Sequence, residues 1–367
     1  MVKLFFYLKN LDWSLFFAIL LLASFGLTEI YSIALGQETV DLLNFKKQIF
    51  FILTGVVCFF IFALLDHDFW KNFSRYFYVL AIVILTGVLF FGKIVNGTRG
   101  WFFIGPFGIQ PVEFAKIVLI ISLAYFFSYH AIKIRSLKQL ITSGLITIGL
   151  CIPTFLQPDF GSAVLLLATW FLLLIFAGFN KKYFIVLFLT VALVVSGLWS
   201  FYFQDYQKQR ILTFLDPTAN VLSSGYNVNQ AMIAVGSGGL LGRGVGFGSQ
   251  SQLKFLPESQ TDFIFAVICE EFGFLGAGLI FLAYLLIFFR CLIAASKTSN
   301  DFGTFFILGA AGLIFIEMFI NISMNLGITP VVGIALPFLS YGGSSIISSF
   351  ILIGIVENII IKSKTNF

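Results

Sequence analysis

Long apolar runs, each of a length that crosses a lipid bilayer, recur from one end of this chain to the other. A transmembrane helix needs about 20 mainly apolar residues, because the hydrocarbon core holds no water to hydrogen-bond an exposed backbone. The 367 residues are 59% hydrophobic and 11% charged, which excludes an ordinary soluble protein. We therefore predict an all-α polytopic membrane protein of about ten transmembrane helices, built as a single integral membrane domain over residues 1–367.

The predicted spans follow the apolar runs. They are 13–32, 48–65, 77–95, 113–128, 137–154, 161–178, 183–203, 262–290, 302–325 and 338–361. The first run is too long for the apolar core of a signal peptide, so we expect it to stay as the first helix. The run 262–290 is long enough to tilt or to extend past the membrane.

The distribution of Lys and Arg predicts the orientation. With the N-terminus in the cytoplasm, most basic residues of the short connections fall inside, and the outer short loops carry only Lys46, Lys47, Lys93 and Arg99. Cytoplasmic loops are enriched in Lys and Arg, so both termini are predicted to be cytoplasmic. The interval 204–261, between helices seven and eight, is then a large extracytoplasmic loop, within which we expect a short interfacial helix over 230–235.

The cysteines and histidines do not cluster in the sequence. The cysteines lie in or beside apolar runs without metal-like spacing, at Cys58, Cys151, Cys269 and Cys291. The histidines, His67 and His130, lie beside the ends of separate runs. The ligand types alone therefore predict no metal site.

A charged pair marks the start of the fourth predicted helix. Glu113 and Lys116 follow Gln110-Pro111 and are i,i+3 neighbours on one helical face. A charge at the centre of a transmembrane helix costs roughly 2.5–3.5 kcal/mol, so each such residue needs a reason. Two interpretations stay open: a self-neutralising pair that allows insertion, or two groups that line a polar cavity.

Further carboxylates precede apolar runs on the predicted outer side. Asp159, in Gln157-Pro158-Asp159, is a natural helix N-cap. Asp262 either caps helix eight, as Thr261 also can, or stands at the mouth of an outward-facing cavity. There it can accept a proton from an attacking sugar hydroxyl. For Glu270 and Glu271, deeper in the same run, a structural network is the favoured interpretation.

Glycine dominates the segment 236–248. The segment lacks the Lys-Ser/Thr of a P-loop and the G-x-G-x-x-G spacing after a strand, so it does not predict nucleotide binding. In one interpretation, glycine lets backbone amides approach an anion such as a diphosphate, with Arg210, Arg243 or Lys254 supplying positive charge. In the other, the segment is a flexible loop.

Taken together, several segments resemble one protein family. They are 97–101 (GTRGW), 110–116 (QPVEFAK), 157–161 (QPDFG), 230–239 (QAMIAVGSGG), 256–271 (LPESQTDFIFAVICEE) and 330–345 (PVVGIALPFLSYGGSS). With these the chain resembles the SEDS family (shape, elongation, division and sporulation). The segment 246–253 is more similar to the elongation branch than to the division branch. Departures from the family pattern are Gln260, Val112 and Gly100, which leave the details of substrate binding open.

The resemblance implies an inverting peptidoglycan glycosyltransferase. Such an enzyme polymerises lipid II, the lipid-linked disaccharide–peptide precursor, into β-1,4-linked glycan strands for cell elongation and rod shape. It works on the outer face of the bacterial inner (cytoplasmic) membrane. Asp262 matches the family's essential acidic residue. The residues expected to bind substrate are those at matching polar positions or within matching segments, together with the basic loop residues: Glu113, Lys116, Asp159, Trp101, Gln230, Ser237, Arg210, Arg243 and Lys254.

The resemblance also implies partners and leaves alternatives. The expected protein partner is a class B penicillin-binding protein, beside lipid II, the nascent glycan strand and membrane lipid, with no nucleic acid. The small residues 309–312 are a candidate contact for the partner's membrane helix. The sequence shows no dedicated cofactor site, although a divalent cation, Mg²⁺ or Mn²⁺, often assists diphosphate chemistry. The alternatives are a lipid II flippase, a polymerase of the division branch, and a scaffold that recruits wall-synthesis proteins.

Overall fold

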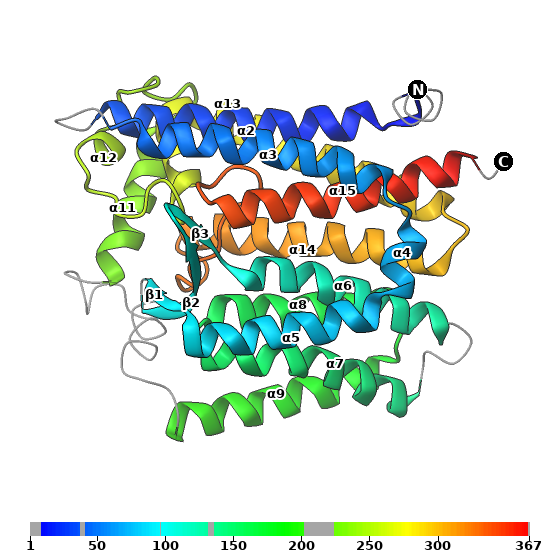
Figure 1. The fold of residues 1–367 in the computed structure, drawn as a ribbon. Coiled ribbons are helices and arrows are strands. Elements are labelled where there is room, and N and C mark those ends of the chain that lie inside the picture. Colours follow the sequence, from blue (N-terminus) through cyan, green and yellow to red (C-terminus); the bar gives the residue numbers. More distant parts are fainter. Residues whose placement is uncertain (1–8, 37–40, 96, 131–135, 202–223, 366–367) are drawn as a thin grey trace.

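The computed structural model of the chain describes residues 9–36, 41–95, 97–130, 136–201 and 224–365. Helices dominate these residues and run along one common direction, with their connections gathered at the two ends of the molecule (Figure 1). The predicted all-α polytopic membrane fold is confirmed, with one small sheet added to it.

The long helices coincide with the predicted apolar runs. They are α2 (Trp13–Leu35), α3 (Leu43–Leu64), α5 (Ser74–Phe91), α6 (Pro111–Tyr129), α7 (Leu137–Leu156), α8 (Phe160–Phe176), α9 (Lys181–Phe201), α13 (Ile264–Lys297), α14 (Asp301–Asn325) and α15 (Gly343–Thr365). Among the described residues, 8 helices are long and apolar enough to cross a membrane. The apolar α8 is shorter, at 17 residues, and α9 falls on the predicted span 183–203.

Short elements complete the ends of the bundle. They are α4 (His67–Asn72), β1 (Lys93–Val95), β2 (Thr98–Ile104), β3 (Phe107–Ile109), α11 (Ser224–Ser237) and α12 (Ser249–Gln252). The strands form an antiparallel sheet in the order β1-β2-β3, which the sequence did not predict. The sheet, α11 and α12 lie at the end opposite α4 (Figure 1). The expected interfacial helix over 230–235 is part of the longer α11.

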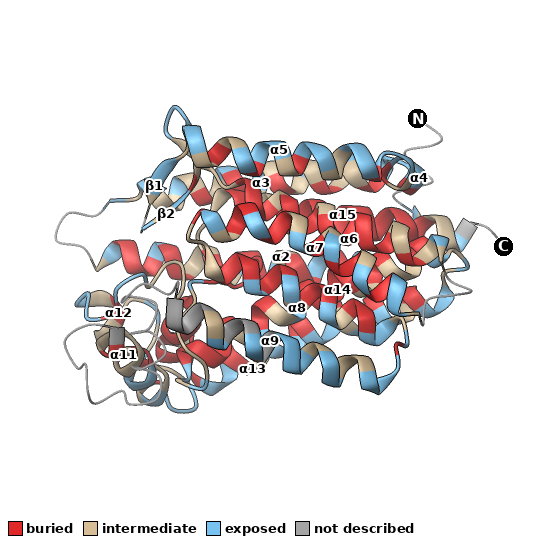
Figure 2. Cartoon of the chain, turned by 90° about the horizontal axis from the view of Figure 1, so that it is seen from below, coloured by how far each residue is buried: buried red, intermediate tan, exposed pale blue. Residues whose placement is uncertain are grey.

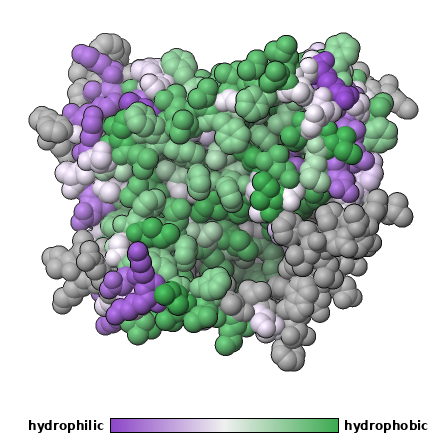
Figure 3. Space-filling model, turned by 180° about the vertical axis from the view of Figure 1, so that it is seen from behind, coloured by the Kyte–Doolittle hydropathy of each residue, from purple (hydrophilic) through white to green (hydrophobic). Residues whose placement is uncertain are grey.

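The surface has the character of a membrane protein. One face shows a broad apolar band between two hydrophilic margins (Figure 3), and large apolar side chains such as Phe17, Phe188 and Phe281 are exposed. Buried residues concentrate along the centre of the bundle, whereas outlying helices such as α5 and α9 present many exposed residues (Figure 2). Lipid tails can cover such a band, which water cannot do without cost.

Both ends of the described chain lie on the same side of the bundle. Lys364 Nζ donates a hydrogen bond to the carbonyl oxygen of Asn10 at 2.7 Å. An even number of crossings gives this arrangement, so it supports the predicted common side for the two termini.

Close packing around α14 corrects one expectation. A Cβ at Gly309 would lie 2.8 Å from Ile120 of α6, and a Cβ at Gly312 would clash with Leu172 of α8. Both glycines are buried and allow α14 to approach these two helices. The prediction that residues 309–312 contact a partner's membrane helix is therefore wrong, because they pack inside this chain.

Several helix boundaries differ from the predicted spans. The α13 helix begins at Ile264 rather than 262, and Gly273 interrupts it with φ 65° and ψ −160°. The α15 helix begins at Gly343 rather than 338, because Phe338 has a φ of 64° that a right-handed helix cannot contain. The α5 helix ends at Phe91, where the chain turns into β1.

Candidate active site

Glu113 and Lys116 form the predicted ion pair at the start of α6. Lys116 Nζ lies 2.8 Å from Glu113 Oε2. The backbone N–H of Gln110, just before the helix, donates to Ser344 Oγ of α15 at 2.9 Å. Ser348 Oγ, one turn further along α15, donates to Glu113 Oε2 at 3.3 Å. The pair is thus real, and it faces polar residues of α15 rather than lipid.

A second carboxylate, which was not among the predicted site residues, completes this group. Glu317 of α14 places its Oε1 atom 2.5 Å from Lys116 Nζ. The three side chains are nearly buried, with exposures of 11% for Glu113, 6% for Lys116 and 7% for Glu317. One ammonium therefore serves two carboxylates inside the bundle. An acidic residue in the middle of the apolar run 302–325 was the available signal.

Asp159 caps α8, as predicted, and also contacts α6. Its Oδ1 accepts the backbone N–H of Ser162 at 3.0 Å, and its Oδ2 accepts the Ser162 hydroxyl at 2.8 Å. Gln110 Nε2 donates to the same Oδ2 at 3.3 Å. Desolvation raises the pKa of the Asp159 carboxyl, against the hydrogen bonds from Ser162, and the charges of Glu113 and Lys116 lie close enough to influence it.

Asp262 lies just before α13, in a segment fastened to its neighbours by side-chain amides. Asn321 Nδ2 and Asn325 Nδ2, both from the end of α14, each donate to the Asp262 carbonyl oxygen at 3.0 Å. The Ser340 hydroxyl donates to the carbonyl of Thr261 at 2.6 Å. The N-cap position of α13 is Phe263, which provides no side-chain cap. The partly buried Asp262 is therefore held in place without occupying the N-cap position.

The loop after α14 brings Asp262 close to the start of α8. A Cβ at Gly333 would lie 3.5 Å from Asp262 Oδ2, and a Cβ at Gly161 would lie 2.7 Å from the carbonyl oxygen of Val332. Two consecutive residues of one loop thus contact Asp262 on one side and the helix that Asp159 caps on the other. The structure gathers four predicted site residues around this loop and the ends of α6, α8 and α13: Glu113, Lys116, Asp159 and Asp262.

The strands cover this end of the bundle. The backbone N–H of Arg99 in β2 donates to the carbonyl of Gln157 at 3.1 Å, so the sheet is fastened to the turn that carries Asp159. Trp101, partly buried in the same strand, packs over Gly108 of β3, where a Cβ would lie 3.0 Å from the indole ring. Trp101 is therefore placed beside the site, and its binding role stays a prediction.

Two backbone amides of the glycine-rich segment are hydrogen-bonded to α13. The N–H groups of Arg243 and Gly244 each donate at 2.9 Å, to the carbonyls of Glu270 and Glu271. In return, the N–H groups of Phe274 and Leu275 donate to the carbonyls of Gly239 and Leu240, at 2.9 and 3.2 Å. The segment thus satisfies backbone groups that the break at Gly273 frees in α13. The expected diphosphate cradle is not formed by these amides, nor is the segment a loop without partners.

The remaining predicted binding residues are spread around the same end of the molecule. Gln230 and Ser237 belong to α11, where Ser237 Oγ donates to the Ala234 carbonyl. Arg243 is exposed and donates to Ser249 Oγ at 2.7 Å, and Lys254 is exposed with a φ of 58°. Arg210 lies outside the described residues. Among the described residues, none of these groups forms a hydrogen bond or ion pair with Lys116, so their roles stay predictions.

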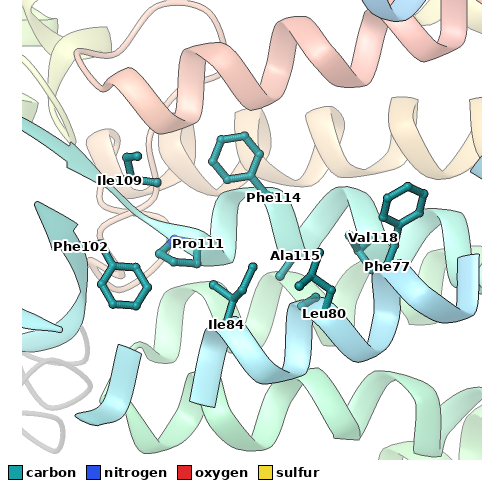
Figure 4. A pocket seen from close by; sticks show the side chains of 10 residues that line it. Phe77, Leu80, Ile84, Phe102, Ile109, Pro111, Phe114, Ala115 and Val118 are labelled. Carbon is teal, nitrogen blue, oxygen red and sulfur yellow. The ribbon is translucent and has the colours of Figure 1, made fainter. Parts of the chain in front are cut away.

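An apolar hollow of about 240 Å³ lies beside α6 (Figure 4). Its α6 residues lie, by helical spacing, on the face opposite Glu113 and Lys116. Phe114 and Ala115, the two residues between Glu113 and Lys116, contribute to its wall. Leu80 is 53% exposed and Ile84 is 38% exposed, so the hollow opens on the apolar surface. Its lining comes from α5, the sheet and α6: Phe77, Leu80, Ala81, Ile84, Phe102, Ile109, Pro111, Phe114, Ala115 and Val118.

One group of metal-ligand types occurs among the described residues, at the opposite end. Ligand atoms of Asp66, His67 and Asp68 lie within 4.8 Å of one another. The ammonium of Lys362 contacts Asp66 and lies 3.9 Å from Asp68. Burial lowers the pKa of His67. A lysine thus already neutralises these carboxylates, which makes the group a poor metal site.

Comparison with known proteins gives a consistent assignment. The family model described as cell cycle protein, which covers FtsW, RodA and SpoVE, matches residues 12–365. The peptidoglycan glycosyltransferase MrdB of Escherichia coli strain K12 is 36% identical over 95% of this chain and 93% of that protein. The stage V sporulation protein E of Bacillus subtilis is also 36% identical, over 93% of this chain and 94% of that protein.

Solved structures share the fold along almost the whole chain. A chain of a solved peptidoglycan synthase complex, which coordinates polymerization and crosslinking, has a TM-score of 0.81 at 26% identity, covering 97% of this chain and 98% of that one. The rod shape determining protein RodA of Thermus thermophilus has a TM-score of 0.72 at 25% identity, covering 95% and 96%. With its sequence, fold and gathered carboxylates in agreement, the chain belongs to the family of FtsW, RodA and SpoVE.

Proposed function

We propose that this protein is a peptidoglycan glycosyltransferase that polymerises lipid II, with Asp262 as the general base. The family and the names of relatives at 36% identity support the reaction class. The observation that carries the assignment to Asp262 is its placement. Its backbone is held by Asn321 and Asn325, and its carboxylate lies near Gly333, whose neighbour Val332 packs against the start of α8.

In this mechanism the growing strand is the donor and lipid II is the acceptor. Asp262 accepts the proton of the acceptor's 4-hydroxyl as that oxygen attacks the anomeric carbon of the donor. The diphosphate leaves from the opposite face, so the α-linked diphosphate is replaced by a β-1,4 bond. The leaving group needs no strong acid, unlike the sugar oxygen released in glycoside hydrolysis.

The charges around the site indicate which cations can stabilise the leaving diphosphate. Lys116 is fully engaged by Glu113 and Glu317, so this group has an excess of negative charge and does not attract an anion. Mg²⁺ or Mn²⁺ prefers oxygen ligands and is commonly held by one or two carboxylates together with substrate phosphates. Asp159 provides a carboxylate of this kind, and a cation held there would neutralise charge on the diphosphate. Arg243 and Lys254 are the exposed basic residues that can add to this effect.

The apolar hollow beside α6 suits the lipid part of the substrate. It opens on the lipid-facing surface, and its wall includes the two residues between Glu113 and Lys116 (Figure 4). A polyprenyl chain seated there would keep its diphosphate near the polar end of the bundle. The substrate would then enter from the membrane rather than from water.

The orientation and the partner are part of the same proposal. The positive-inside distribution supports an orientation with the sheet and α11 outside the cytoplasmic membrane and with the site facing outward. A class B penicillin-binding protein would cross-link the strands, and the synthase complex named for a structural relative supports such a partner. Exposed apolar residues of α13 and α14, such as Leu282 and Phe319, are available for a membrane helix in place of residues 309–312.

The test is polymerisation of labelled lipid II by the purified protein together with its penicillin-binding partner. We expect the wild type to make glycan strands, whereas Asp262→Ala and Asp262→Asn bind the partner and make none. Glu258→Gln is the matched control, because Glu258 is an exposed carboxylate in the same segment, and it should remain active. Normal polymerisation by the Asp262 variants would refute the catalytic assignment. Movement of lipid II across vesicles without polymerisation would favour the flippase.

A further inference from the structure

A second group of carboxylates lies in the bundle, away from the residues assigned to catalysis. Glu29 of α2 is 0% exposed, and neither of its oxygens has a hydrogen-bond donor among the described residues. Ser32, one turn after Glu29 on the same face of α2, donates to Glu271 of α13 at 2.6 Å, which brings Glu271 beside Glu29. The charges of Glu271 and Glu270 both repel a charge on Glu29. No basic side chain contacts Glu29 in the described part of the chain. A buried carboxylate without a donor or a counter-ion is unfavourable by several kcal/mol.

The two neighbours of Glu29 differ in how they are satisfied. Glu270 accepts the backbone N–H groups of Gln250 and Ser251, at 2.9 and 3.2 Å, which suits a charged carboxylate. Glu271 accepts the Ser32 hydroxyl at 2.6 Å and the side-chain amide of Gln252 at 3.3 Å. Glu271 thus receives hydrogen bonds, as Glu270 does. Glu29 receives none from any described residue, and the polar atoms that face it are the acceptor oxygens of Glu271. Two facing acceptors make a hydrogen bond only if one of them carries a proton.

We propose that Glu29 and Glu271 form a proton-binding pair, in which the protonated Glu29 carboxyl group donates a hydrogen bond to the Glu271 carboxylate. The other titratable or charged groups that face Glu29 are Glu270 and Cys269 of α13. Arg243 donates to Ser249 Oγ, which lies 3.3 Å from Glu270, so this guanidinium is linked to Glu270 rather than to Glu29.

The pair fastens three parts of the molecule at one point. Ser32, one turn after Glu29, donates to Glu271 and accepts the backbone N–H of Gly246 at 2.9 Å. Glu271 directly precedes the break of α13 near Gly273. The proton therefore links α2 to the part of α13 that lies between Asp262 and the break at Gly273. Through Ser32, α2 is also linked to the glycine-rich segment. Loss of the proton would place two carboxylates face to face and loosen this point.

Infrared difference spectroscopy tests the proton directly, because a protonated carboxyl group has a carbonyl-stretch band that a carboxylate lacks. We expect this band in the wild type at neutral pH. Glu29→Gln removes the protonated group, and Glu271→Gln offers an amide donor to Glu29, so either variant should lose the band. Glu270→Gln is the matched control from the same group and should keep it. A band unchanged in both Glu29→Gln and Glu271→Gln would overturn the proposal.

Thermal unfolding across pH is the second measurement. The proton is bound in the folded state and released on unfolding, so the wild-type Tm should fall as pH rises, and more steeply than that of Glu29→Gln. Equal slopes for the two proteins would contradict the proposal. A wild-type Tm that rises with added Mn²⁺ or Mg²⁺ and falls with a chelator, but not in Glu29→Gln, would also overturn it, because a metal ion would then occupy the site.

Discussion

Lys116 and Glu317 are 201 positions apart in the sequence, yet their Nζ and Oε1 atoms lie 2.5 Å apart in the bundle. With Glu113 on the other side of the ammonium, this contact joins α6 to α14 below the proposed site. The group holds two helices that carry neighbours of Asp262 and Asp159. Disruption of this group is therefore expected to lower the stability of the protein, and to lower its activity indirectly by displacing Asp262 and Asp159.

Removal of the shared cation should be strongly destabilising. Lys116→Met leaves Glu113 and Glu317 buried without a counter-charge, which typically costs about 3–5 kcal/mol. Unfolding of the purified protein in detergent measures the loss. The double variant Lys116→Met/Glu317→Gln should recover part of it, because one of the unpaired charges is gone. Lys138→Met, at an exposed lysine, is the control, and an equal effect of both lysine variants would contradict the assignment.

The break in α13 should tolerate only glycine. Gly273 has φ 65° and ψ −160°, a region almost restricted to glycine, and a Cβ there would lie 2.7 Å from the Leu240 carbonyl oxygen. Gly273→Ala should therefore destabilise the protein by about 1–3 kcal/mol from strain alone. Gly278→Ala is the control on the same helix, because a Cβ there meets nothing within 4 Å. It should be neutral or stabilise by about 0.5–1 kcal/mol. Thermal unfolding of both variants checks the difference.

The sequence predicted those features that depend on neighbours along the chain. Apolar length identified the long helices, the i,i+3 spacing identified the Glu113–Lys116 pair, and the position before an apolar run identified the Asp159 cap. Each depends on local geometry that a few residues determine. The family resemblance, rather than any local pattern, singled out Asp262 above the other carboxylates.

Features that depend on contacts between distant segments were missed. Glu317 was recognisable as an unusual charge, but nothing in the sequence identified Lys116 as its partner. The glycine-rich segment has the composition of an anion-binding loop, and its actual role depends on the break at Gly273, far along the chain. The start of α15 was misplaced because Phe338 is apolar, although its backbone is left-handed.

The amide of Asn321 should position Asp262 without taking part in the chemistry. Its Nδ2 donates to the carbonyl of Asp262 at 3.0 Å and to that of Ile334 at 2.7 Å, so it fixes both sides of the site. Asn321→Ala should lower kcat for lipid II polymerisation about tenfold, equivalent to ~1.4 kcal/mol, and leave KM nearly unchanged. Asn300→Ala removes the N-cap at the other end of α14 and serves as a control for stability loss. A matching fall of kcat in that control would indicate a merely structural role.

Filling the apolar hollow should weaken binding of the lipid-linked substrate. Ile84 lines the hollow and is partly exposed, so Ile84→Trp would occupy space that the polyprenyl chain needs. We expect KM for lipid II to rise several-fold, because the polyprenyl chain would bury a few methylene groups fewer, and each buried methylene contributes about 0.8 kcal/mol to binding. Val83→Trp, on the same helix and 60% exposed, does not line the hollow and should leave KM unchanged. A substrate analogue with a short lipid should be less sensitive to Ile84→Trp than lipid II, because it contacts less of the hollow. Equal effects of the two tryptophan variants on KM would place the lipid chain elsewhere on the bundle.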